Sequence, residues 1–293
     1  MSEDDRISPD DSVSEDESAS EGEGYASESN GEDEPLAHIS PGDQIRIGTS
    51  SETASYPSVL STVPDEEIGE GLEWVSDDIR DRLGVDEEAE LFVQPYAPHP
   101  EYTTRDEAKA HDEFVEYLVE HGETPLAVTA PHGGRIEYRT DRQARQVATT
   151  LDATEWGCFG YNEGGGAYKR CHITSTELSC RSFPRLDSIS DRDFEHAVSF
   201  HGFTKDGIAI GGGAPQDLKE RFRDAIDDAT EGAYDVYIPE KGTQYAGTSS
   251  DNFVNWLPRD GNGIQIEQCR DARVDDYEKI ADAVVSVYRE LLD

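Results

Sequence analysis

The order of hydrophobic patterns in the last two thirds of the chain limits its fold more than any other feature. Short apolar runs typical of buried strands alternate with longer amphipathic stretches typical of helices. Strands are expected at residues 126–128, 156–161, 173–175, 198–201, 208–210, 235–238 and 264–267, and helices at residues 104–121, 141–151, 216–230 and 275–292. This alternation predicts an α/β fold built on a central sheet.

The segment before this pattern divides into two parts of different composition. Residues 1–40 contain 14 acidic residues, one arginine and almost no apolar side chains, which predicts a disordered acidic tail. Residues 41–95 are mixed: residues 44–48 alternate like an edge strand, and Leu72, Val75 and Ile79 indicate a small ordered unit. We therefore expect a small β-rich N-terminal subdomain at 41–95, followed by one α/β domain at 96–293.

The charge of the chain is strongly negative, with a formal net charge of −40 from 65 acidic and 25 basic residues. A nucleic-acid partner is disfavoured, because phosphate contacts need clustered lysine and arginine. Repulsion among the many negative charges destabilises a compact state in dilute buffer. It is screened when the Debye length falls to about 3 Å at 1 M salt. The charge is thus typical of a halophilic protein.

The sequence contains no apolar run that approaches the length of a membrane span, and its N-terminus lacks a basic region followed by an apolar core. We expect a cytoplasmic protein without a membrane partner. The four cysteines show no Cys-x-x-Cys spacing, so free thiols are expected, although Cys171 and Cys180 could form a disulfide in an exported protein.

Residues that bind metals or act as bases stand at the ends of three predicted strands. His132 and Glu137 flank the glycine turn after residues 126–128, His201 ends residues 198–201, and Glu267 ends residues 264–267. Active sites of open α/β sheets lie at the carboxyl ends of strands. A single histidine at a strand end is more often structural, but three strand ends that carry such residues favour an active site. Two imidazoles and one carboxylate form a ligand set that leaves zinc a fourth position for water.

Four motifs in chain order resemble the poly-γ-glutamate hydrolase family. They span residues 130–140, 172–175, 199–202 and 263–267, and the similarity extends from Leu126 to the C-terminus. That family is similar in fold to zinc carboxypeptidases, which implies a mixed central sheet with helices on both faces. The resemblance also implies that His132, Glu137 and His201 hold Zn²⁺ and that Glu267 is the general base.

These residue types suit the hydrolysis of an amide bond. Zinc polarises the carbonyl and lowers the pKa of a bound water from about 15.7 to about 7, and a glutamate can take up the proton. A nearby cation should stabilise the oxyanion. The candidates are arginines, with Arg273 and Arg139 ranked before Arg181 and Arg270, although a surface ion pair is the commoner role for any one of them.

Three further residues are expected to contact substrate: His172, Asn255 and Arg181. His172 resembles the family's His-Ile-Thr-Ser segment, and its alternatives are support of the metal ligands or a place in the core. The chain has Asn255-Trp256 where relatives tend to have Asn-Arg, and tryptophan cannot replace a guanidinium that grips a carboxylate.

The predicted function is zinc-dependent cleavage of amide bonds in poly-γ-glutamate or related γ-glutamyl peptides. An acidic polymer of this kind would be repelled by the acidic protein unless salt screened the repulsion. Two alternatives stay open at the level of sequence. One is a carboxypeptidase- or acylase-like amidohydrolase that acts on small acyl-amino acids. The other is a non-catalytic acidic interaction protein.

Overall fold

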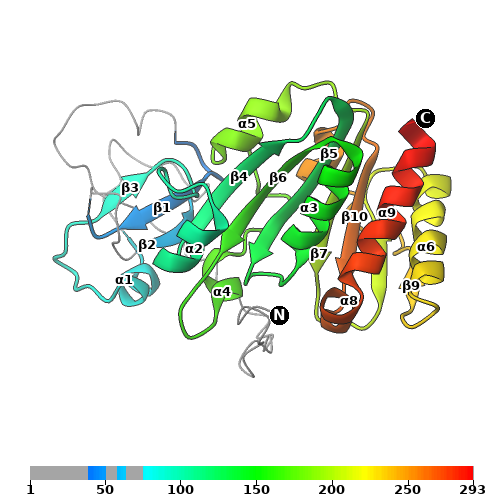
Figure 1. The fold of residues 1–293 in the computed structure, drawn as a ribbon. Coiled ribbons are helices and arrows are strands. Elements are labelled where there is room, and N and C mark those ends of the chain that lie inside the picture. The colour runs from blue at the N-terminus through cyan, green and yellow to red at the C-terminus, as the bar shows by residue number, and fades with distance from the viewer. Residues whose placement is uncertain (1–38, 51–57, 64–74, 293) are drawn as a thin grey trace.

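The computed structural model describes residues 39–50, 58–63 and 75–292 (Figure 1). The predicted disordered tail lies almost wholly outside these residues, as does Leu72. All four cysteines are free thiols. No helix of the described ranges is both long and apolar enough to cross a bilayer.

A seven-stranded mixed sheet forms the centre of the molecule, with strand order β4-β6-β5-β7-β10-β8-β9. The strands β6, β5, β7 and β10 run parallel, while β4 and β8 run antiparallel to their neighbours β6 and β10. The bounds are β4 (Phe114–Glu120), β5 (Thr124–Gly134), β6 (Ala153–Gly160), β7 (His196–Gly202), β8 (Ile208–Gly211), β9 (Val236–Tyr237) and β10 (Gly263–Gln268).

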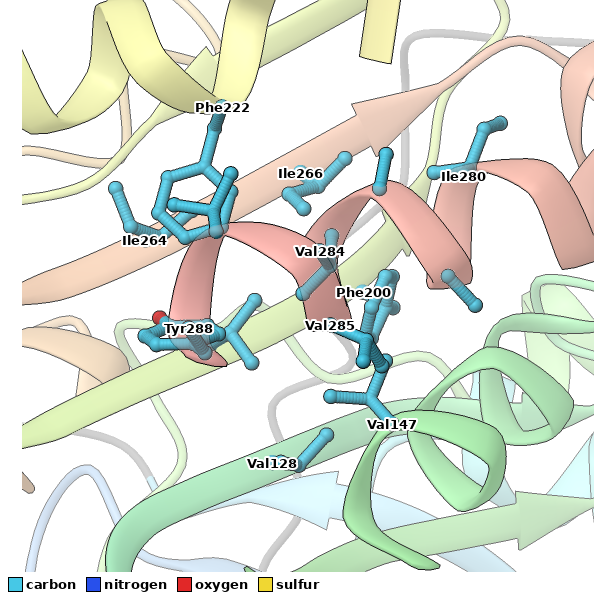
Figure 2. Close-up of a cluster of buried hydrophobic side chains, with 14 of the residues drawn as sticks. Val128, Val147, Phe200, Phe222, Ile264, Ile266, Ile280, Val284, Val285 and Tyr288 are labelled. Atoms are coloured by element: carbon cyan, nitrogen blue, oxygen red, sulfur yellow. The ribbon is translucent and has the colours of Figure 1, made fainter. Parts of the chain in front are cut away.

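Helices cover both faces of this sheet, which confirms the predicted fold class (Figure 1). On one face α9 (Tyr277–Leu292) packs beside α3 (Thr140–Leu151) and α6 (Gln216–Ala229). Figure 2 shows Val284 and Val285 of α9 directed toward Phe200 of β7, within one buried apolar cluster. On the other face, Trp156 packs with Phe183 and with side chains of α5 (Pro184–Ser190) and α7 (Phe253–Trp256). The remaining helices of this part are α2 (Arg105–His111), α4 (Ala167–Cys171) and α8 (Arg270–Asp275).

A separate three-stranded antiparallel sheet lies beside β4 in the N-terminal part (Figure 1). It consists of β1 (Gln44–Gly48), β2 (Ser58–Thr62) and β3 (Phe92–Gln94), and α1 (Asp77–Leu83) packs on it. The prediction that residues 44–48 form an edge strand was wrong, because β1 is the central strand and all five residues are buried. The polar residues in this strand misled the prediction, because Arg46 pairs with the buried Glu113, the residue before β4, and does not point to solvent.

Two other expectations for single elements were wrong. The helix expected at 104–121 is α2 followed by β4, because Asp112 adopts φ 53° and ends the helix. Beyond it, residues 114–120 are rich in β-branched and aromatic side chains, which favour a strand. Residues 173–175 form no strand but an irregular segment after α4, and they pair with no strand of the sheet.

Candidate active site

The end of β5 brings His132 and Glu137 to one point. Gly134 adopts φ 74°, a conformation that glycine permits without a steric penalty, and the chain turns back there. The Glu137 N–H donates to the His132 carbonyl at 2.8 Å, which closes the turn. As a result, the His132 Nδ1 lies 3.0 Å from Glu137 Oε1.

The neighbouring strand β7 adds His201 to this pair. Its Nδ1 lies 3.3 Å from the His132 Nδ1 and 3.6 Å from Glu137 Oε2. The Gly202 N–H donates to the same Oε2 at 2.8 Å and so fixes the carboxylate. His132, Glu137 and His201 are between 2% and 5% exposed, which places three groups capable of binding a cation in one buried cluster.

Hydrogen bonds on the far side of each ring fix which nitrogen faces the cluster. The His132 Nε2 lies 2.8 Å from the Ile173 carbonyl, which can only accept, so this nitrogen carries the proton. The His201 Nε2 contacts the Ser199 hydroxyl at 2.7 Å. The Nδ1 atoms of both rings and the Glu137 carboxylate therefore face the same space. This arrangement suits a bound cation, and outer hydrogen bonds of this kind orient metal-binding histidines.

His172 approaches the cluster from the coil that follows α4. Its Nε2 lies 3.6 Å from Glu137 Oε1, and its ring centroid lies 4.2 Å from that of His132. The possible ligand atoms of His132, Glu137 and His172 all lie within 4.8 Å of one another, so His172 is a second candidate for a third ligand besides His201. Its side chain is 23% exposed, in contrast to the buried His201.

The charge states of these groups suit a metal. Burial lowers the pKa of His172 to about 3 and also lowers the pKa of His201, so both rings are neutral near pH 7. Burial opposes the charge of Glu137, but attraction and hydrogen bonds from His132 and His201 outweigh it and hold its pKa well below the usual value. Neutral imidazoles beside an ionised carboxylate are the forms that bind metals.

Glu267 lies next to this cluster on β10, at the position paired with His201 on β7. Its carboxyl group is buried, and the Gln265 amide donates to Oε1 at 2.8 Å. Burial and the negative charge of Glu137 together raise the pKa of Glu267 well above its usual value. Two nearby carboxyl groups thus have pKa values shifted in opposite directions, an arrangement that separates a ligand from an acid or base.

Arg273 is the arginine that joins the site among the four predicted candidates. Its buried guanidinium donates to the Gln268 carbonyl through Nε and to the Tyr138 carbonyl through Nη1, each at 3.2 Å. A Cβ at Gly202 would overlap this guanidinium, so the glycine beside His201 leaves the space that Arg273 fills.

The other predicted arginines and Asn255 are engaged elsewhere. Arg139 donates to the Val274 carbonyl at 2.5 Å and lies over the Tyr277 ring, and Arg270 is exposed. Arg181 is 57% exposed and pairs with Asp43 at 2.6 Å. Asn255 holds two loops together, since it accepts from Gly213 N–H and donates to the carbonyls of Gly247 and Ser249, each at 2.7 Å. Sequence position alone could not show which way these side chains turn.

Sequence reasoning missed three contributors to the site. The Ile173 carbonyl and the Gly202 N–H are backbone groups, which leave no signal in residue identity. Tyr168 is the third: it is 40% exposed, and its ring stacks on His172 with centroids 4.3 Å apart. In the sequence, a tyrosine between the glycines 164–166 and His172 is a weak signal of a site residue, since such a ring could equally have packed in the core.

Comparison with known proteins shows the family of the chain. The family model of poly-γ-glutamate hydrolases matches residues 102–283, more than half of the chain. The chain belongs to the poly-γ-glutamate hydrolase family. The protein is therefore an enzyme of the peptidase and amidohydrolase class, and the non-catalytic alternative is set aside. No curated protein matches the chain.

Among the solved structures that align with the chain, one supports the fold. A bacteriophage poly-γ-glutamate hydrolase aligns with a TM-score of 0.50 and 19% identity, over 60% of this chain and 89% of that one. A structure described as zinc-free YndL aligns with a TM-score of 0.49 and 21% identity, over 61% and 90% of the two chains. A metallo-carboxypeptidase from Burkholderia cenocepacia has a TM-score of 0.38 and 10% identity, over 85% and 81%.

Proposed function

We propose that the protein is a zinc-dependent hydrolase of γ-glutamyl amide bonds and that His132, Glu137 and His201 hold the metal. The observation that carries the proposal is the convergence of two Nδ1 atoms and a carboxylate in a buried cluster. Two imidazoles and one carboxylate are a common ligand set of catalytic zinc, which keeps one coordination position open.

The surroundings of the two candidate rings favour His201 as the third ligand. His201 lies on a central strand, is 2% exposed and is oriented by Ser199. His172 lies on a coil at the solvent side and stacks on the exposed Tyr168. We therefore assign His172 to the side from which substrate enters, where its neutral ring can donate or accept a hydrogen bond.

The residues around the proposed metal site carry out the other parts of the reaction, which are proton transfer and stabilisation of charge. When bound, zinc supplies positive charge that polarises an amide carbonyl and lowers the pKa of water. The Glu267 carboxylate takes a proton from the attacking water and returns it to the departing amine nitrogen. Arg273, which attracts both Glu137 and Glu267, balances their negative charge and stabilises the charge that develops on the carbonyl oxygen.

The proposed substrate is poly-γ-glutamate or a shorter γ-glutamyl peptide, as family membership suggests. A polyanion is repelled by a protein of net charge −40, so we propose that the enzyme works in concentrated salt, where this repulsion is screened. Trp256, which is partly buried, stands where relatives tend to carry an arginine that can bind a carboxylate, and Asn255 is bonded to two loops. This favours a second candidate substrate, small acyl-amino acids, and assays of both classes in molar salt separate the two.

Glu267→Gln tests the assignment of the general base. The amide keeps the size of the carboxyl group and cannot take up a proton, so turnover should fall about 10²- to 10⁴-fold. Zinc content, measured by mass spectrometry of the metal, should equal that of the wild type because Glu267 is not a proposed ligand. Wild-type turnover in this variant contradicts the assignment, and Glu177→Ala, at an exposed residue, is the control.

A further inference from the structure

Residues 162–183 run between the proposed metal site and the three-stranded N-terminal sheet. The middle of this segment supplies two contacts to the site, the His172 ring and the Ile173 carbonyl. In the described residues the segment contains α4 but no strand, so the central sheet does not fix it by strand pairing. Residues on both sides of His172 and Ile173 are bonded to the N-terminal unit, which we define as the described residues of 39–99.

The first attachment is made by Arg170, two residues before His172. Its Nη2 donates to the Ser58 carbonyl of β2 at 3.3 Å, and its Nη1 donates to the Asp112 carbonyl at 2.5 Å. The carboxylate of Glu113 reinforces this junction, since it lies 4.0 Å from Arg170 and forms a buried ion pair of 2.6 Å with Arg46 of β1. The guanidinium of Arg170 thus joins α4 to β2.

The second attachment is made by Arg181 and Ser182, at the other end of the segment. The Gln44 N–H donates to the Ser182 hydroxyl at 2.9 Å, and the Ala97 N–H donates to the Ser182 carbonyl at 3.1 Å. Arg181 pairs with Asp43 at 2.6 Å. These partners all belong to the N-terminal unit, and Ser182 is fully buried.

The N-terminal unit lies outside the part of the chain that matches the family model, which begins at residue 102. We infer that this unit positions the active site: it holds the segment at Arg170 and at Arg181–Ser182, on either side of His172 and Ile173, and so keeps the His172 ring and the Ile173 carbonyl against the metal ligands. Arg170 and Ser182 are positioning residues, since they touch neither metal nor substrate. The inference rests on the proposed function in one respect, that His132 is a metal ligand.

The physical consequence is a preorganised site. The Ile173 carbonyl sets the orientation of His132, and partners of this kind typically change metal affinity or activity by 10- to 100-fold when they are lost. The side of the segment that faces the main domain is held by the burial of Ile173 and Leu178 and by the bond from the Phe253 N–H to the Ser175 carbonyl. The two attachments hold its other side, and without them the Ile173 carbonyl would have more freedom to move away from the His132 ring.

The test uses the double variant Asp43→Asn/Ser182→Ala and the single variant Arg170→Met. The double variant weakens the attachment at Arg181 and Ser182 with little change in side-chain shape. Arg170→Met removes the attachment at Arg170. The matched control is Asp224→Asn/Ser188→Ala, on the exposed surfaces of α6 and α5. Two measurements are made on full-length protein: amide hydrogen exchange of residues 167–176 after treatment with a chelator, and the zinc dissociation constant by competition with a fluorescent chelator.

The expected result is faster exchange of residues 167–176 by about tenfold or more and about tenfold weaker zinc binding in both attachment variants, with the control unchanged. The lysine variant Arg170→Lys should restore part of both losses. Unchanged exchange and zinc affinity in folded attachment variants overturn the inference. If the wild type binds no zinc, the proposed function fails, and hydrogen exchange of the chelator-treated protein still decides whether the N-terminal unit holds the segment.

Discussion

At the scale of single residues, the carboxylate of Glu137 connects the parts of the site. It faces His132 through one oxygen and His201 and the Gly202 N–H through the other. The meeting of His132, Glu137 and His201 was predictable from sequence, because strand ends beside glycines converge at one edge of a sheet. The outer partners Ser199 and Ile173 were not predictable, since a serine and a backbone carbonyl occur throughout the chain.

Gly202→Ala tests the close packing of Arg273 beside His201. The added Cβ overlaps the guanidinium, which must move away from Glu137 and Glu267. We expect kcat/KM to fall by about 10- to 100-fold, about 1.4 to 2.7 kcal/mol of lost transition-state stabilisation, with zinc content unchanged. Steady-state kinetics in molar salt check this, and kinetics equal to the wild type contradict the role of Arg273.

At the scale of elements, the parts that sequence predicted best are the helices α3, α6 and α9. Each is long and carries an apolar stripe that repeats with helical period, and each packs on the same face of the sheet (Figure 1). The elements that were predicted wrongly are short, or their hydrophobic pattern is ambiguous. Residues 114–120 contain apolar side chains at spacings that suit either a helix or a strand, and pairing of β4 with β6 decided between them.

Ile280→Ala tests the packing of α9 on the central sheet. Ile280 is fully buried in the cluster of Figure 2, and loss of a buried isoleucine side chain leaves a cavity. We expect the free energy of unfolding to fall by about 2–5 kcal/mol, measured by denaturant titration. Ser286→Ala, on the exposed side of the same helix, should change it by less than about 0.5 kcal/mol. Equal effects of the two variants contradict the packing.

At the scale of the whole molecule, charge rather than fold is the unusual property. The net charge of −40 arises from 65 acidic residues against 25 basic ones, and only part of it belongs to the N-terminal tail. Several acidic side chains are nevertheless bound within the fold, such as Glu113 to Arg46 and Glu155 to Arg145. The sign and size of the charge were plain from composition, whereas the burial of these two carboxylates depends on the fold.

Salt should therefore stabilise the protein. Between about 0.1 M and 1 M NaCl the Debye length falls from about 10 Å to about 3 Å, which weakens repulsion among the surface carboxylates. We expect the melting temperature to rise over this range and the rise to flatten above it, as measured by scanning calorimetry. Sucrose at matched osmolality is the control for solute exclusion. A melting temperature that stays constant or falls with salt contradicts a halophilic protein.

The most direct test of the proposed metal centre is the zinc content of the purified protein. Protein prepared in molar salt should contain about one zinc ion per chain, and Glu137→Ala should contain almost none while it remains folded. The exposed Glu177→Ala should keep the wild-type content. A folded wild type without stoichiometric zinc after supplementation, or a Glu137→Ala variant that keeps its zinc, would contradict the account.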